Sequence, residues 1–131
     1  MALASPRPCA LKFRSKLERR FWVDTNLPYE TRKFKYVKPA TSHTYTPDFH
    51  IPGTNIYIET KGRWTGADRQ KHLLIKAQHP EVRIVLAFQD HRITINKNSK
   101  TTYGDWATAN GLEWLSVEDC VKFVQENTPC A

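Results

Sequence analysis

One short stretch of the chain predicts two antiparallel strands joined by a tight turn. The turn residues Pro52-Gly53-Thr54-Asn55 separate Thr46–Phe49 from Ile56–Gly62. A turn centred on those four residues places Asp48 directly opposite Glu59, and opposed residues point to the same face with Cβ atoms about 5 Å apart. A bulge in either strand would shift this register by one residue. The other face is apolar and should face a core: Phe49, Ile51, Ile56 and Ile58.

The polar face of this hairpin carries a combination of charges that suggests chemistry. Opposed carboxylates at Asp48 and Glu59 repel each other, unless a divalent cation lies between them. Hard cations such as Mg²⁺ take carboxylate, water and phosphate oxygens as ligands. Lys61 lies two residues beyond Glu59 and hence on the same face, where an ammonium could orient a water or hold a phosphate. The set suits metal-assisted phosphodiester hydrolysis, although a surface hairpin with scattered charges would show the same pattern.

The distribution of basic residues points to a polyanionic partner. The chain has 131 residues, which favours one domain, and a formal net charge of +7. Fifteen of its twenty Lys and Arg residues precede position 77, in the half that carries the acidic hairpin. A positive surface around a carboxylate pocket fits nucleic acid better than lysines that only maintain solubility. The candidate phosphate contacts, which would position DNA without reading its sequence, are Arg14, Lys16, Arg63, Arg69, Lys71 and Lys76.

Cysteine and hydropathy patterns exclude two other classes of protein. Cys9, Cys120 and Cys130 form neither a CxxC motif nor a Cys/His cluster, so a zinc site is not expected. The odd count and the lack of a signal-peptide pattern predict a reducing, cytoplasmic setting. The chain has no run of about eighteen apolar residues that could span a membrane.

Periodicity and breakers predict a mixed α/β domain with a central β-sheet flanked by helices. Residues 1–11 should form a mobile basic arm, and residues 12–131 a single domain. Expected helices cover 14–26, 67–78, 102–110 and 116–125. Expected strands are the hairpin, which should begin near Tyr45, then 82–88 and 112–115, with an extended basic segment at 29–38. The polar connection 90–100 could hold a further short strand at 93–95.

Several motifs together resemble a known family. Pro47-Asp48 followed by Glu59-Thr60-Lys61, behind a helix that bears Glu18, looks like the PD-(D/E)xK nuclease superfamily. The match is closer to phage endonuclease I, the four-way-junction resolvases of short-tailed phages, and runs from about Lys12 to Phe123. The motifs that carry it are FRSKLE (13–18), HTYTPDF (43–49), ETKG (59–62), RQKHLLI (69–75) and TYGD (102–105). Both ends differ, because this chain has its own N-terminal arm and lacks a long basic tail.

The resemblance implies a restriction-endonuclease-like fold and two Mg²⁺ or Mn²⁺ ions in each active site. Asp48 would bridge the ions, Glu59 and the Thr60 carbonyl would complete one site, and Glu18 the other. Lys61 would contact the attacking water or the scissile phosphate. Glu30 matches a further acidic position of the family. The segment from Glu30 to Asp48 is shorter here, however, and an ordinary exposed glutamate explains that residue equally well.

The resemblance also implies a domain-swapped homodimer. Each active site would take Glu18 from one chain and Asp48, Glu59 and Lys61 from the other, with residues 38–42 as the crossover. A two-fold protein would present two sites to the two opposed strands of a junction. A plain loop at 38–42 is the alternative, because Pro39 occurs in both kinds of connection.

The function expected from all these features is a metal-dependent, structure-selective DNA endonuclease. It would resolve four-way (Holliday) junctions and other branched DNA in recombination by hydrolysis, leaving 5′-phosphates, and it has no pattern of a base-reading helix. A transposon-end or restriction-type nuclease would share the core, but would need a recognition domain for which 131 residues leave little room. A catalytically silent DNA-binding module is the third hypothesis, and intact Asp48, Glu59 and Lys61 argue against it.

Overall fold

The computed structural model describes residues 12–38 and 41–129. The predicted N-terminal arm, residues 1–11, lies outside this part of the chain. The elements are α1 (Lys16–Thr25), β1 (Phe34–Lys38), β2 (Thr41–Tyr45), β3 (Phe49–His50), β4 (Ile56–Lys61), α2 (Gly66–Gln78), β5 (Arg83–Phe88), α3 (Tyr103–Ala109), β6 (Glu113–Ser116) and α4 (Val117–Asn127). None of the helices in the described ranges has the length and apolar character needed to span a bilayer.

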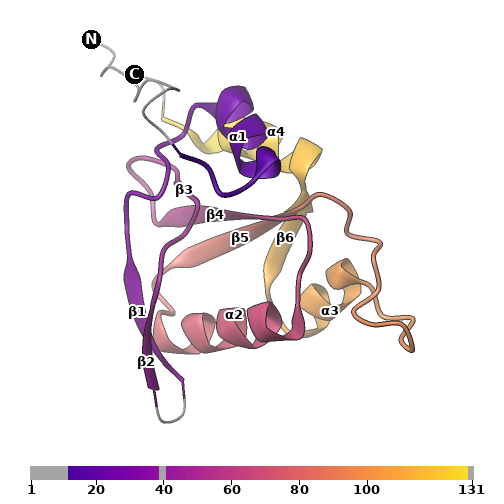
Figure 1. Cartoon of the computed structure of the whole chain (residues 1–131). Helices are drawn as coiled ribbons and strands as arrows, with labels where there is room; N and C mark the ends of the chain where they lie inside the picture. The colour runs from indigo at the N-terminus through magenta and orange to yellow at the C-terminus, as the bar shows by residue number, and fades with distance from the viewer. Residues whose placement is uncertain (1–11, 39–40, 130–131) are drawn as a thin grey trace.

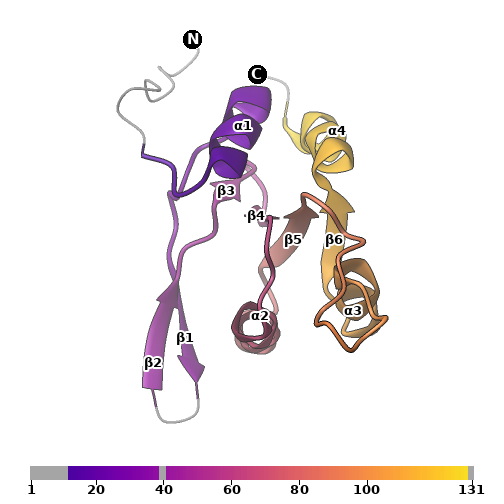
Figure 2. The same cartoon turned by 45° about the vertical axis from the view of Figure 1, so that its right-hand side comes forward.

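A four-stranded mixed sheet lies at the centre, in the order β3-β4-β5-β6. The β3–β4 pair is antiparallel, and β4–β5 and β5–β6 are parallel. Helices α1 and α4 lie on one side of the sheet, and α2 and α3 on the other (Figures 1 and 2). The predicted mixed α/β class, with a sheet between helices, is therefore confirmed.

Strand β5 shows why the sheet needs helices on both sides. Its residues alternate between two core clusters, with Val85 and Ala87 in the cluster under α1 and α4. Leu86 and Phe88 belong to the cluster with Trp64 and α3. A strand that is apolar on both faces is typical of the interior of a parallel sheet. The run at 82–88, which is apolar apart from Arg83, predicted this central position, and the structure confirms it.

The β3–β4 hairpin has the register that the turn predicted. Phe49 pairs with Ile58, and His50 with Tyr57. The Ile51 amide donates to the Ile56 carbonyl at 3.0 Å, which closes the turn. Gly53 takes a φ of 77° there, a left-handed conformation that glycine adopts without a steric penalty. The expected core face is also confirmed, because Phe49, Ile51, Ile56 and Ile58 are all buried.

Two expectations about strands were wrong. The β3–β4 hairpin does not begin near Tyr45, because Thr41–Tyr45 forms β2 and pairs antiparallel with β1 in a separate two-stranded ribbon. The alternation of basic and aromatic residues in β1 suggested an extended segment, but the polar sequence of β2 gave no sign of its partner. At 93–95 the structure has only an isolated bridge between Thr94 and Thr102 instead of a strand. A single bridge forms there because Thr102 is already the N-cap of α3.

The helices begin where hydroxyl side chains can satisfy free amides. Ser15, Thr65, Thr102 and Ser116 each accept a hydrogen bond from the amide three residues on. Thr65 and Asp68 form a full capping box at the start of α2. Helix α1 ends at Asn26 in a left-handed conformation, just before Leu27-Pro28. These local signals set the ends of α1 and α2, and thereby the places of the acidic residues near them.

Candidate active site

The acidic residues of the hairpin open into a cleft of about 630 Å³. Glu59, Thr60 and Lys61 are the last residues of β4, and Asp48 comes immediately before β3. Glu18 reaches the same cleft from the first turn of α1. The structure therefore brings together the residues that the hairpin register and the family resemblance had each predicted separately.

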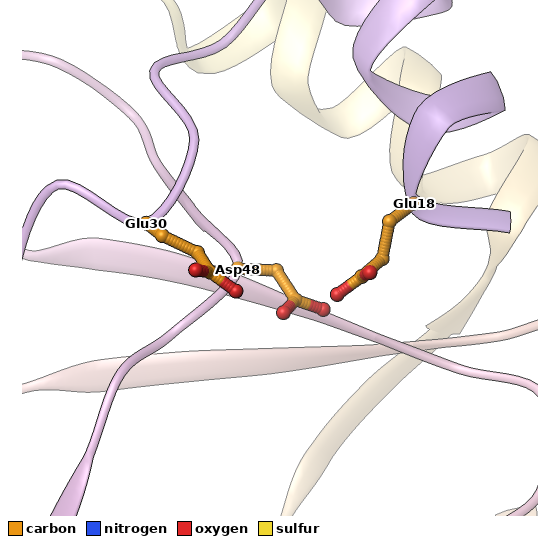
Figure 3. A group of neighbouring side chains, drawn as sticks. All are labelled: Glu18, Glu30 and Asp48. Atoms are coloured by element: carbon orange, nitrogen blue, oxygen red, sulfur yellow. The ribbon is translucent and has the colours of Figure 1, made fainter. Parts of the chain in front are cut away.

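Three carboxylates from separate parts of the chain converge at one end of this region. Glu18, Glu30 and Asp48 each offer an oxygen atom within 4.8 Å of the others. Figure 3 shows their side chains pointing toward one another, from α1, from the connection after α1 and from the start of β3. Glu18 and Asp48 are buried and Glu30 is half-buried. The alternative of an ordinary exposed glutamate at position 30 does not fit this placement.

Backbone contacts hold Glu30 beside Asp48. The Glu30 amide donates to the Asp48 carbonyl at 2.8 Å, next to a bridge between Tyr29 and Phe49. Glu30 has a φ of 50°, which costs free energy for a residue other than glycine. The Arg14 guanidinium lies 3.3 Å from the Glu30 carboxylate. The chain thus tolerates backbone strain at the point where a third carboxylate meets the cluster.

Asp48 is held by the strand beside it. Its Oδ2 accepts hydrogen bonds from the Thr60 amide at 3.0 Å and from the Thr60 hydroxyl at 2.9 Å. Both of these bonds go to the same carboxylate oxygen, and the Glu18 carboxyl group also lies within hydrogen-bond reach of the Asp48 side chain. The Asp48 amide approaches Glu59 Oε1 at 3.4 Å. Asp48 therefore lies next to both Glu59 of β4 and Glu18 of α1.

Glu59 lies between a hydroxyl and an ammonium. Its Oε1 accepts from the Tyr45 hydroxyl at 2.8 Å, and its Oε2 lies 3.3 Å from Lys61 Nζ. Lys61 Nζ also lies 3.8 Å from Asp68, the capping-box residue of α2, which is 4.0 Å from Lys71. The β3–β4 hairpin is thus connected to the start of α2 by ion pairs.

Burial and crowding of like charges dominate the electrostatics of the site. Burial, and then the nearby Glu59 and Glu18 carboxyl groups, raise the pKa of Asp48 far above its usual range, to about 9. Burial also raises the pKa of Glu59, against the opposing effect of Lys61. Burial lowers the pKa of Lys61, but the Glu59 and Asp68 carboxylates outweigh it and the net shift is upward. Lys61 therefore stays charged beside Glu59 and Asp68, while the raised pKa of Asp48 favours a proton on that carboxyl group in the absence of another cation.

This donor set fits a hard divalent cation. Every candidate ligand atom is an oxygen, which Mg²⁺ and Mn²⁺ accept, and no cysteine or histidine belongs to the converging group. The raised pKa of Asp48, caused first by burial and then by the neighbouring Glu59 and Glu18 carboxyl groups, shows that this position favours an added positive charge. A bound cation would replace the proton that Asp48 otherwise takes up.

The six predicted phosphate contacts separate into two groups. Arg14, Lys16, Arg63 and Lys71 line the acidic cleft, as a basic rim around the carboxylates. Arg69 instead donates to the Trp64 carbonyl at 2.9 Å and lies over the Trp106 ring. The Lys76 ammonium donates a hydrogen bond to the Gly111 carbonyl, and its side chain lines a different cavity, of about 250 Å³. Of the six, only the four rim residues share the cleft with the candidate catalytic groups.

Three residues of the site region escaped the sequence analysis. Tyr29 and Tyr45 each donate a hydrogen bond to a site carboxylate, and Asp68 faces Lys61. The capping-box spacing of Thr65 and Asp68 was the available signal for Asp68. The two tyrosines have no comparable spacing signal, because their contacts depend on how separate elements pack.

His72 lies beside the site but does not enter the cleft. It is 2% exposed, and its ring meets the Tyr45 ring edge-on with centroids 5.5 Å apart. Burial, and then the nearby Lys61 and Lys71, lower the pKa of His72 to about 3. His72 therefore packs as a neutral side chain on α2.

The lowered pKa of His72 predicts a specific dependence of stability on pH. Between about pH 6.5 and pH 3 the unfolded chain protonates this histidine and the folded chain does not, so folding stability falls as pH decreases. The slope attributable to His72 should approach about 1.4 kcal/mol per pH unit. Urea unfolding of wild type and His72→Leu at several pH values between 4 and 7.5 measures it, with the exposed His43→Leu as control. Equal slopes in wild type and His72→Leu would refute the assignment.

One chain supplies the whole carboxylate cluster in this structure. Glu18 of α1 and Asp48 at β3 meet within the one chain that the structure describes. The described residues of the expected crossover, Lys38, Thr41 and Ser42, lie at the end of the β1–β2 ribbon, where Lys38 pairs with Thr41 and Val37 with Ser42. A single chain can therefore bring Glu18 and Asp48 together.

Comparison with known proteins relates this site to phage nucleases. A family model described as phage endonuclease I matches residues 6–129. Endonuclease I of Escherichia phage T7 is 48% identical over 86 residues, which cover 66% of this chain and 57% of that protein. Endodeoxyribonuclease 1 of Enterobacteria phage T3 is 49% identical over 84 residues, covering 64% of this chain and 55% of that protein. The chain thus spans little more than half the length of the curated relatives it matches.

Proposed function

Because this chain belongs to the phage endonuclease I family, we propose that it is a metal-dependent DNA endonuclease that resolves four-way junctions and other branched DNA by phosphodiester hydrolysis. The observation that carries the proposal is the cleft in which Glu18, Asp48, Glu59 and Lys61 converge under a basic rim. Buried carboxylates suit divalent cations, and the rim suits a phosphate backbone. A silent DNA-binding module would have no need to bury such a costly set of charges.

The arrangement of elements supports a restriction-endonuclease-like fold of the PD-(D/E)xK type. That pattern places an acidic residue before one strand and a Glu-x-Lys at the end of the next. Here Asp48 precedes β3, and Glu59 and Lys61 lie at the end of β4. Strand β4 pairs in parallel with β5, and β5 pairs in parallel with β6. Helix α1 then covers the sheet from the side on which Glu18 enters.

The site residues of this chain would have separate roles in hydrolysis. Asp48 would be shared between two cations, with Glu18 and Glu30 completing one site, and Glu59 and the Thr60 carbonyl the other. When bound, Mg²⁺ or Mn²⁺ lowers the pKa of a water and offsets charge on the scissile phosphate. Lys61, kept charged by Glu59 and Asp68, would hold the scissile phosphate or orient the attacking water. Water is the nucleophile, no covalent intermediate forms, and the product carries a 5′-phosphate.

Substrate selection would depend on shape and charge. Arg14, Lys16, Arg63 and Lys71 surround the cleft and can contact phosphates on either side of the cut. The sequence has no pattern of a base-reading helix, so selectivity would arise from how a branch point fits the rim. This favours a structure-selective enzyme over a restriction-type or transposon-end nuclease.

A homodimer is the assembly that suits a four-way junction. The junction has approximate two-fold symmetry, and a two-fold dimer would present one cleft to each of two opposed strands. Exchange of the α1 segments through residues 38–42 would re-form the same Glu18–Asp48 contacts between chains. Sedimentation velocity would test the dimer, and junction cleavage by a mixture of Glu18→Gln and Asp48→Asn chains would test the exchange, because only a swapped heterodimer regains one intact site.

The primary test compares a labelled four-way junction with a linear duplex of the same sequence, in Mg²⁺ and in EDTA. Paired, metal-dependent cuts near the branch point support the proposed function and the dimer. Tight junction binding without cutting in any divalent metal would establish the silent module instead. Equal cutting of junction and duplex would establish a general nuclease and refute structure selectivity.

A further inference from the structure

Two buried tyrosines donate hydrogen bonds to two different site carboxylates. The Tyr29 hydroxyl donates to Glu18 Oε1 at 3.1 Å, and the Tyr45 hydroxyl donates to Glu59 Oε1 at 2.8 Å. The tyrosines come from separate elements, the connection after α1 and the end of β2. One carboxylate lies on the α1 side of Asp48, and the other follows on β4. Each outer carboxylate of the proposed site therefore has its own tyrosine.

The Tyr29 hydroxyl is oriented before any ligand arrives. It accepts from the Arg14 amide at 3.4 Å, which directs its own proton toward Glu18. Its ring packs against Phe13 and Phe49, with centroid distances of 4.4 and 5.3 Å. These contacts restrict the movement of the ring that carries the hydroxyl.

The Tyr45 hydroxyl is fixed by the ribbon and by α2. The ring is 3% exposed and packs in the cluster with Tyr36 and Ile75. Lys71 Nζ lies over its face, 5.5 Å from the centroid. Burial, and then the Glu59 charge, hold the pKa of the Tyr45 hydroxyl well above its usual range, so the group remains a donor.

A hydrogen bond from a buried tyrosine restricts the orientations that a glutamate side chain can adopt. A free glutamate has several side-chain torsions, and ordering it costs conformational free energy when it binds a cation. Each carboxylate offers about four acceptor positions, so one tyrosine proton leaves the second oxygen available. Groups that hold metal-ligating carboxylates from behind have this effect in other metal sites, where their loss weakens metal binding by about 10- to 100-fold.

We propose that Tyr29 and Tyr45 are positioning residues that hold Glu18 and Glu59 in the orientation that a divalent cation requires. This inference rests on the proposed function, because it gives the tyrosines a task only if the carboxylates bind a cation. A purely structural tyrosine would use its hydroxyl to satisfy burial, and its loss would change folding stability rather than metal affinity.

The test measures Mn²⁺ affinity without DNA, by calorimetry and by the electron paramagnetic resonance signal of free Mn²⁺. Tyr29→Phe and Tyr45→Phe should each weaken Mn²⁺ binding by about 10- to 100-fold. Tyr57→Phe is the matched control, because its ring is 4% exposed and its hydroxyl makes no hydrogen bond to a site carboxylate within the described residues. The melting temperature in EDTA is recorded for every variant, and affinities are compared only where each variant is folded.

A double-mutant cycle separates positioning from a structural role. If Tyr45 acts through Glu59, then Tyr45→Phe should add little to the loss of Mn²⁺ affinity already caused by Glu59→Gln. Full additivity, or wild-type Mn²⁺ affinity in both single tyrosine variants, would overturn the inference and leave the proposed function intact. Failure of the wild-type protein to bind any divalent cation would overturn the proposed function, and the inference with it.

Discussion

Replacing Asp48 by asparagine should abolish DNA cleavage and leave the fold intact. The amide keeps the size of the carboxylate and can still accept hydrogen bonds from Thr60, as Oδ2 does now at 3.0 and 2.9 Å. It loses the charge at the point where Glu18, Glu30 and Glu59 approach, so the shared cation ligand disappears. We expect kcat to fall by more than about 10²-fold, since the loss of an inner ligand should exceed the effect of an outer-shell partner.

The same substitution should leave the metal-free protein at least as stable as wild type at pH 8. Asp48 is 5% exposed and crowded by like charges, which is why its pKa is raised. Neutral asparagine removes that repulsion. Junction binding, measured by gel shift in Ca²⁺ or EDTA, should remain within a few-fold of wild type. Asp24→Asn, at an exposed position of α1, is the matched control. Retained cleavage, or global unfolding with loss of binding, would remove Asp48 from the proposed site.

Replacing Lys61 by methionine should reduce cleavage without weakening metal binding. Methionine has a similar length and no charge, so the ammonium 3.3 Å from Glu59 is lost and the carboxylates remain. If Lys61 orients the attacking water or the scissile phosphate, kcat should fall by about 10²- to 10⁴-fold. Mn²⁺ affinity should stay the same or increase, because Lys61 no longer competes for Glu59.

The stability of Lys61→Met provides a second measurement. Glu59 is 6% exposed and would lose its nearest cation, so the free energy of unfolding should fall in EDTA and recover in Mn²⁺. Lys122→Met, on the exposed face of α4, is the control for loss of a lysine alone. A Lys61→Met enzyme that cleaves at the wild-type rate would contradict the assigned role. Weaker Mn²⁺ binding in that variant would assign Lys61 to metal-site structure instead.

Part of the site could be predicted from local sequence. The turn at residues 52–55 fixes the β3–β4 register, and this register brings Asp48 beside Glu59. Strand periodicity then places Lys61 near both. The short separation along the chain explains why this step succeeded, because few alternative pairings exist for two strands joined by a tight turn. Glu18 was identified only through the family resemblance, since nothing local relates α1 to the hairpin.

Other contacts depended on packing between distant segments. The strand partner of β1, the convergence of Glu30 on Asp48, and the tyrosine hydroxyls on Glu18 and Glu59 join elements with no fixed spacing. Arg69 and Lys76 were predicted as phosphate contacts from their positive charge alone. The packing of the chain instead places Arg69 against the Trp64 carbonyl and Lys76 in a different cavity.

The sequence by itself determined the helix caps, the hairpin register, the apolar central strand and the charge of the first half of the chain. Each of these depends on interactions within a few residues, which turn geometry, side-chain period and hydrogen-bonding groups specify directly. Only the tertiary structure decided which carboxylates meet Asp48, which hydroxyls hold them, and which cations face the cleft. Those outcomes follow from how α1, the β1–β2 ribbon and α2 pack on the sheet, and packing depends on the shape of the whole core rather than on any one segment.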